Sequence, residues 1–314
     1  MEKKNKLSQL PVVFLLAMLC CFLWGSATPA IKKGYEIFGI DNSDTISIIL
    51  FAGIRFFLAG ILVIIFQSIM AGHFIKPQKG SFPLIFKLSL AQTIVQYFCF
   101  YVGLAHTSGV AGTILSGASG FFSILLVSIV FRQEKLTIPK IIGCIMGFGG
   151  LIIMNVSFKG GTVFHFSLMG EGLVLLSTIS LALSGILVKG YSKRFDVVML
   201  SGYQFILGGF VMIAVGLILG GRITLVPHFS AYMLLLYMAL ISAVAYSVWG
   251  ILMKNNPVSR VSIFSFMTPL FGVLLSAIFL GEVEQALSIN KLIALVLVSA
   301  GIYVVNRKYG KDAA

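Results

Sequence analysis

Charged side chains are scarce in this sequence, and acidic ones are the scarcest. Only 10 of the 314 residues are Asp or Glu, and charged residues of both signs make up 11% of the chain, whereas soluble domains carry roughly 25%. Hydrophobic residues make up 58%. A chain of this composition cannot cover a surface that faces water. It therefore excludes an ordinary soluble domain and indicates an integral membrane protein.

Other absences exclude particular kinds of chemistry. The sequence has no nucleotide-binding loop of the GxxxxGK[ST] type, so we do not expect the chain to hydrolyse ATP. Its apolar segments hold no carboxylate pair and no HExxH motif, which argues against an enzyme, a metal site or a cofactor. The cysteines show neither metal-ligand nor disulfide spacing. They are Cys20, Cys21, Cys99 and Cys144.

Long apolar runs are what the chain has in quantity. A helix needs about 20 residues to cross the ~30 Å hydrocarbon core of a bilayer, and a lone strand would leave its backbone groups unpaired there. The sequence therefore predicts an all-α integral membrane protein with ten transmembrane helices. The runs cover residues 11–31, 46–70, 84–104, 109–131, 138–156, 170–189, 197–219, 231–253, 257–281 and 288–306.

Lys and Arg indicate how these helices are oriented, because basic residues collect on the cytoplasmic side of a membrane. With the N-terminus inside, 17 of the 23 Lys and Arg lie on the cytoplasmic side and 5 outside, and Arg55 lies within a run. Both termini are then cytoplasmic, in a plasma or bacterial inner membrane. This use of basic residues explains the net charge of +13 better than nucleic-acid binding does.

The sequence also repeats itself. Residues Ser108–Glu134 resemble Asn256–Glu282, and Gly53–Ile64 resembles Gly202–Ile213. Each half then holds five helices, and because five is odd the halves lie in opposite orientations, as in the inverted repeats of secondary transporters. The predicted division is a first repeat at 1–156, a linker at 157–168 and a second repeat at 169–314.

These features resemble those of a known family, the EamA-type transporters of the drug/metabolite transporter superfamily. The residues that carry the resemblance are Trp24-Gly25 with the small polar stretch to Lys32, Arg55-Phe56, Tyr101–Ser108, and the helices ending at Glu134 and Glu282. The resemblance implies two five-helix bundles around a central cavity and transport by alternating access. It implies amino acids or related metabolites as exported substrates, with drug-like compounds second.

Polar and aromatic side chains at helical spacing are the candidates to line that cavity, since polar groups facing lipid are costly. They are Trp24, Thr28, Gln92, Gln96, Ser116, Ser180, Tyr246, Trp249 and Ser265. The alternatives are packing for Ser116, hydrogen bonds within or between helices for the other serines and the glutamines, and a place in the interfacial aromatic belt for Tyr246 and Trp249.

Two prolines are candidate hinges or gates, because proline removes a backbone hydrogen bond. Pro29 lies in the first helix and Pro269 in the ninth. The family that the chain resembles often carries proline in both repeats, whereas Phe121 occupies the matching place in the first repeat. We therefore expect an asymmetric hinge.

Four charged residues lie in or at the ends of the apolar runs. Arg55 could hold a substrate carboxylate or phosphate, but an arginine that snorkels outward as a structural device is the favoured interpretation. Glu171 fits the start of a helix, with proton coupling as the alternative. Glu134 and Glu282 are expected to bond backbone amides or basic residues.

A transporter whose partners are a small-molecule substrate and the lipid bilayer is thus the prediction. A channel or a membrane scaffold is the alternative, although no selectivity device is visible. The sequence leaves open the substrate, the energy source, and whether the protein is a monomer or a homodimer.

Overall fold

The computed structural model of the protein describes six stretches of the chain. They are residues 6–41, 43–106, 115–155, 167–224, 229–280 and 289–311. Regular structure within these stretches is helical, and none of them contains a strand. The fold class predicted from composition is therefore confirmed.

The helices of the first half follow the predicted runs closely. They are α1 (Leu10–Phe38), α2 (Thr45–Ala71), α3 (Phe82–Ser89), α4 (Gln96–Ala105), α6 (Ser119–Leu125) and α7 (Ile138–Asn155). A π-helical turn at Leu90–Val95 joins α3 to α4, and a second at Leu126–Val130 extends α6. The third span is thus one continuous helix with a wide turn inside it, and the described part of the fourth span, from residue 115, has a wide turn at its end.

The second half repeats this order. Its helices are α8 (Leu173–Tyr191), α9 (Val197–Ile218), α10 (Phe229–Asn255), α11 (Val258–Ser262), α12 (Met267–Leu280) and α14 (Ile289–Lys311). A π-helical turn, η4 (Leu168–Gly172), leads into α8, and a 3-10 turn, η5 (Ile263–Phe266), joins α11 to α12. Within the described residues, six helices are long and apolar enough to cross a membrane and three are shorter apolar helices, and the α11–α12 segment completes the ten predicted spans.

The first helix is longer than its apolar run predicts. It continues past Pro29 to Phe38 rather than ending near residue 31, and Gly39 ends it with a φ of 62°, a conformation that suits glycine. The extension carries an ion pair between Lys33 and Glu36 at 2.7 Å. Hydropathy therefore missed the final turns because they are polar.

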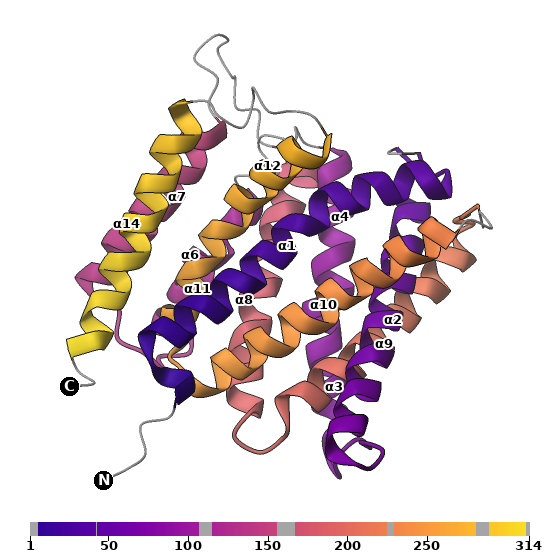
Figure 1. The fold of residues 1–314 in the computed structure, drawn as a ribbon, viewed down its shortest axis with the longest axis horizontal. Helices are drawn as coiled ribbons and strands as arrows, with labels where there is room; N and C mark the ends of the chain where they lie inside the picture. Colours follow the sequence, from indigo (N-terminus) through magenta and orange to yellow (C-terminus); the bar gives the residue numbers. More distant parts are fainter. Residues whose placement is uncertain are drawn as a thin grey trace.

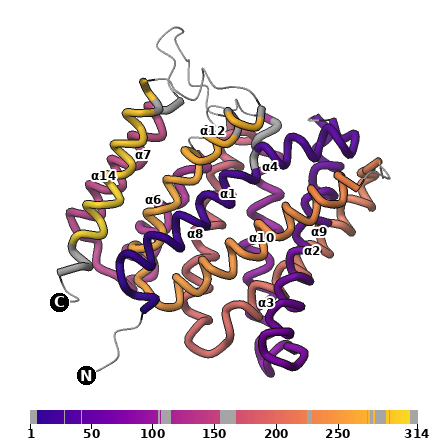
Figure 2. The backbone as a smooth tube through the Cα atoms, viewed as in Figure 1, coloured from indigo at the N-terminus to yellow at the C-terminus, as the bar shows by residue number. Residues whose placement is uncertain are grey.

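Equivalent helices of the two halves pack side by side. Helix α2 lies along α9, and α7 lies along α14 (Figures 1 and 2). The other main contacts also correspond between the halves. Helix α1 packs on α10 and α12, and its repeat equivalent α8 packs on their equivalents α4 and α6. Helix α1 begins and α14 ends at the same edge of the molecule (Figure 1), as an even number of spans requires. The contacts are those of an inverted repeat about a pseudo-two-fold axis.

Glycines bring α2 and α9 into backbone contact. A Cβ atom on Gly60 would lie 2.6 Å from the carbonyl oxygen of Gly202, and one on Gly209 would lie 2.8 Å from that of Gly53. Gly53 and Gly60 are the repeat equivalents of Gly202 and Gly209. Small residues allow membrane helices to approach closely, so the repeated glycines hold the two halves together.

We expect Gly60→Ala to destabilise the protein by about 1–3 kcal/mol, the usual cost of overpacking, because backbone atoms of α9 cannot move aside singly. Gly149→Ala in α7 is the matched control, since nothing lies within 4 Å of its Cβ position. Thermal unfolding in detergent, followed by size-exclusion chromatography, compares the two variants. Equal unfolding temperatures would show that the α2–α9 contact is not tight.

Candidate substrate site between the two halves

Two pairs of aromatic residues meet where the halves meet. Phe56 stacks on Phe205 with ring centroids 5.3 Å apart and an interplanar angle of 14°. The hydroxyl groups of Tyr97 and Tyr246 lie 3.0 Å apart. Each pair joins residues separated by 149 positions in the sequence, which is the spacing of the repeat between Gly53 and Gly202. The pseudo-two-fold axis therefore passes through this cluster.

Three of the predicted cavity residues lie beside these pairs. The ring of Trp24 on α1 is 5.2 Å from that of Tyr246 and 5.0 Å from that of Trp249, both on α10 and both edge-on. The indole Nε1 of Trp24 is buried, and no acceptor contacts it in the described parts of the chain. An indole N–H usually finds a partner when buried, so this donor is available to a bound molecule.

The two glutamines add unsatisfied acceptors. Gln96 is 8% exposed, and its amide lies near the Tyr246 hydroxyl. The Oε1 atoms of Gln92 and Gln96 are buried and have no hydrogen-bond donor among the described residues. Since buried polar atoms nearly always have a partner, these oxygens could accept hydrogen bonds from a substrate.

The other predicted cavity residues have different surroundings. The Ser180 hydroxyl donates to the backbone oxygen of Ala91 at 2.7 Å, and the Ser265 hydroxyl donates to that of Ser262 at 2.7 Å. Ser116 lies half-buried just before α6, and the side chain of Thr28 is outside what the structure describes. A role for any of these four in binding stays a prediction.

Arg55 points into the protein rather than towards a membrane surface. It is 4% exposed. Its Nε and Nη2 atoms donate to the hydroxyl of Ser242 at 3.2 and 2.9 Å, and its guanidinium carbon lies 5.1 Å from the ring centroid of Phe56. No ion pair to Arg55 occurs within the described ranges. The predicted outward snorkelling is therefore not what the structure shows.

The second half contains the neutral counterpart of this contact. Gln204 is the repeat equivalent of Arg55, and Thr93 is that of Ser242. Thr93 donates to Gln204 Oε1 at 2.8 Å. The same polar contact thus occurs on both sides of the axis, but only one side carries a charge.

Glu171 lies at the start of the sixth span. Its carboxylate accepts from the backbone N–H of Ser167 at 2.8 Å, while the Ser167 hydroxyl accepts from that of Gly170 at 3.3 Å. This reciprocal pattern resembles a capping box and places a negative charge at a helix N-terminus. The geometry supplies a structural role for Glu171, and proton coupling stays untested.

The prolines lie in different local settings. Pro29 is buried inside the continuous helix α1. Pro269 is the third residue of α12, which follows the 3-10 turn η5. In the first half a turn also precedes α6, with the N–H of Ala118 donating to the carbonyl oxygen of Leu115 at 3.1 Å, and a π-helical turn follows α6. Both spans are therefore irregular just before these helices, and a hinge at Pro269 remains a prediction.

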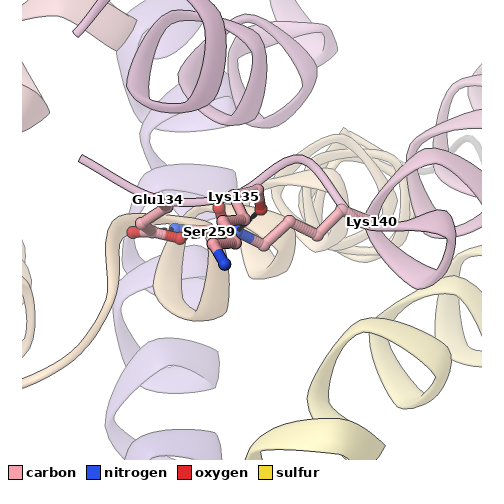
Figure 3. A network of polar contacts seen from close by, with 4 residues as sticks. All are labelled: Glu134, Lys135, Lys140 and Ser259. Carbon is pink, nitrogen blue, oxygen red and sulfur yellow. Dashed lines mark hydrogen bonds and ion pairs between the residues drawn. The ribbon is translucent and has the colours of Figure 1, made fainter. Parts of the chain in front are cut away.

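A second polar cluster, the Glu134 network, joins the halves at the edge where α1 begins (Figure 3). Glu134 pairs with Lys140 at 2.8 Å and accepts from the backbone N–H of Ser259 at 3.3 Å, while Lys140 also donates to the Lys135 carbonyl at 2.9 Å. The predicted bonding of Glu134 to a basic residue and a backbone amide is confirmed. Glu282 lies outside the described residues.

Neighbouring residues add further polar contacts at this edge. Arg260 donates to the carbonyl oxygen of Ser8 at 3.0 Å, Asn256 donates to that of Leu7 at 2.9 Å, and Lys189 donates to that of Asn256 at 2.6 Å. Polar contacts thus join the start of α1, the end of α8 and the α10–α11 connection at this edge of the molecule.

Several residues of the central cluster are not among the predicted cavity residues. Tyr97 and Tyr101 lie four positions apart on α4, and Tyr35 lies near the end of α1. The repeat contains a signal for Tyr97, because it and Tyr246 have the spacing of the repeat. Ser242, the partner of Arg55, lies one helical turn before Tyr246 on α10.

Two inverted halves of five membrane helices, with a buried polar site at their junction, define a membrane transporter of the inverted-repeat class. A family model described as "EamA-like transporter family" matches residues 12–156 and again residues 168–307. The chain therefore belongs to the EamA-like transporter family, as its resemblance predicted.

Relatives of known name are similar over most of the chain. A transporter of Bacillus subtilis, named uncharacterized, is 28% identical over 96% of this chain and 94% of its own length. An Escherichia coli protein named "Probable amino-acid metabolite efflux pump" is 26% identical over 92% of this chain and 93% of its own length. One solved crystal structure matches with a TM-score of 0.76 over 97% of this chain and 99% of that chain, at 16% identity, which shows a shared fold.

Proposed function

We propose that this protein is a secondary carrier that exports amino acids or related small metabolites by alternating access. The observation that carries the proposal is the cluster of Trp24, Gln96 and Tyr246 at the junction of the halves, where a buried donor and a buried acceptor have no partner among the described residues. A substrate bound there would contact both halves at once, so a rocking motion of the halves would move access from one side to the other.

The relatives favour amino acids as the first substrates to test. Two of them, from Escherichia coli and Salmonella typhimurium, are named as probable amino-acid metabolite efflux pumps, each at 26% identity. The aromatic walls of the cluster also suit a flat, drug-like compound, so a multidrug carrier is the alternative. The proposed location is the plasma membrane with both termini cytoplasmic. The edge that holds the Glu134 network is then the cytoplasmic edge.

Counterflow in proteoliposomes tests the proposal. Vesicles containing purified protein are loaded with unlabelled amino acids, and uptake of each labelled amino acid is followed with and without a proton gradient. Saturable exchange of one group identifies a carrier and its substrates, whereas linear, unsaturable flux would indicate a channel. Absence of exchange by folded protein would exclude amino acids, and a panel of drug-like compounds would then test the multidrug alternative.

Within that assay, we expect Trp24→Ala and Gln96→Ala each to raise the apparent KM about tenfold or more, because each removes a contact of roughly 1.4 kcal/mol to the bound substrate. Tyr303→Ala is the control, since Tyr303 lies 63% exposed on α14, away from any proposed contact. Unchanged KM values in both cluster variants, at equal protein amounts, would place the substrate elsewhere.

A further inference from the structure

Arg55 is a buried cation for which the described residues supply no counter-ion. Within the described residues, its guanidinium donates hydrogen bonds only to the neutral hydroxyl of Ser242. The other buried cations are matched differently, since Lys140 pairs with Glu134 and Arg260 lies among backbone and amide oxygens at the edge of the bundle. A guanidinium has five donors, and a buried charge is costly unless it is paired. The site is therefore suited to an anion.

Four tyrosines surround this charge. The hydroxyls of Tyr97 and Tyr246 bond to each other. Tyr35, Tyr97, Tyr101 and Tyr246 all lie close enough to Arg55 to interact with it electrostatically. In the Tyr97–Tyr246 pair one hydroxyl donates and the other accepts, and the accepting hydroxyl still has a hydrogen to donate. The pair can thus donate to an anion while keeping its own hydrogen bond.

The charge of the site indicates which anion it would take. One guanidinium balances one negative charge and matches the planar, two-oxygen geometry of a carboxylate. A phosphate dianion would leave a net negative charge buried. One helical turn along α10 from Ser242, Tyr246 lies near Gln96, whose Oε1 has no donor among the described residues. That oxygen suits an ammonium group.

We propose that Arg55 binds the carboxylate of the substrate, and that Gln96 accepts from its ammonium group. The inference rests on the proposed carrier function and names the part of the substrate that the carrier recognises. Recognition is then asymmetric, because the equivalent position in the other half holds Gln204. The substrate would bind off the pseudo-two-fold axis, with its carboxylate on the side of α2.

The test compares amino acids with their amides, which keep the ammonium group but lose the carboxylate. Counterflow is measured for the twenty amino acids and for the corresponding amides, and binding is measured as the ligand-induced rise in unfolding temperature. We expect wild-type protein to exchange amino acids with an apparent KM at least about 100-fold lower than that of the amides, the fold-change that follows from loss of a buried charged hydrogen-bond pair.

Two substitutions then separate binding from structure. Arg55→Gln places at this position the residue that the second half carries at the equivalent position, and we expect it to raise the KM for amino acids about 100-fold while the KM for amides changes less than threefold. Arg55→Lys keeps the charge without the planar fork and should recover part of the affinity for amino acids. A purely structural arginine would instead lower the unfolding temperature and affect both ligand series equally.

Three results would overturn the inference. Wild-type protein could exchange amides as well as amino acids, Arg55→Gln could leave the KM for amino acids unchanged, or it could weaken amides and amino acids to the same degree. If wild-type protein exchanges neither series while remaining folded, the proposed amino-acid export itself fails. That outcome differs from a carrier that works without using Arg55.

Discussion

Replacing Glu134 with glutamine is expected to lower the stability of the protein by about 3–5 kcal/mol, because removing one partner of a buried ion pair leaves the other charge unpaired. The side chain of Lys140 is 5% exposed and that of Glu134 is 13% exposed. The substitution also removes a negative acceptor from the backbone N–H of Ser259. The contact between the two halves at this edge would then be weakened.

A double-mutant cycle separates these effects. Lys140→Met alone leaves Glu134 uncompensated and should also destabilise the protein, whereas Glu134→Gln with Lys140→Met should recover most of the loss. Unfolding temperatures in detergent give the four corners of the cycle. Additive losses would show that the two side chains do not act as a pair, whatever their distance.

The pH dependence of this pair follows from the pKa of Glu134. Burial would raise that pKa, but hydrogen bonds from Lys140 and Ser259 outweigh burial and hold the pKa below its ordinary value of 4.5. A carboxylate with a depressed pKa contributes stability above its unfolded pKa and loses it as the pH falls through the folded value. We therefore expect the pair to persist between pH 7.5 and 5.5 and to weaken only below 4.5.

Transport should consequently show no titration of Glu134 between pH 7.5 and 5.5. A proton gradient within this range cannot open the edge that holds the Glu134 network by protonating Glu134, so opening must use another event, such as substrate binding. A step in the transport rate within this range that disappears in Glu134→Gln would contradict the assignment. A cysteine introduced at Ser259 provides a second measurement. If this cysteine is labelled faster in Glu134→Gln than with Glu134 in place, the network restrains opening.

Most of the fold could be predicted because lipid imposes a simple pattern. Thr45 and Val197 begin α2 and α9 within a residue of their predicted runs, and in both cases an aspartate immediately before the helix accepts from its backbone. The prediction failed where the chain left the apolar pattern, as in the polar extension of α1 to Phe38. Wide turns inside the third and fourth spans also left no hydropathy signal.

The site was harder to predict because it depends on which helix faces which. Trp24, Gln96 and Tyr246 were predicted to face the protein interior because polar and aromatic groups inside apolar runs are costly against lipid, but which of them meet could not be predicted. The direction of Arg55 depends on Ser242, which lies 187 positions away in the sequence. Helical spacing within one run contains no information about such a partner, whereas the repeat spacing that relates Tyr97 to Tyr246 does.

The stacked phenylalanines at the axis provide the other large expected effect. Phe56→Ala and Phe205→Ala should each destabilise the protein by about 3 kcal/mol, because both rings are fully buried and their removal leaves a cavity whose lining loses its packing contacts. The pseudo-symmetry predicts nearly equal unfolding temperatures for the two variants. A large difference would show that the stack is not shared evenly by the halves.

Each ring also packs on one tyrosine of the central pair, Phe56 on Tyr97 at 4.4 Å and Phe205 on Tyr246 at 5.0 Å between centroids, so the two residues serve as controls for each other. Only Phe56 lies under the Arg55 guanidinium, and such a contact contributes up to about 2 kcal/mol when it is desolvated. Phe56→Leu and Phe205→Leu lose the same aromatic pair, but only Phe56→Leu leaves Arg55 without its ring. If Arg55 is held ready for a carboxylate, Phe56→Leu should raise the KM for amino acids several-fold more than Phe205→Leu does. Equal KM values in the two leucine variants would mean that Ser242 alone positions the guanidinium.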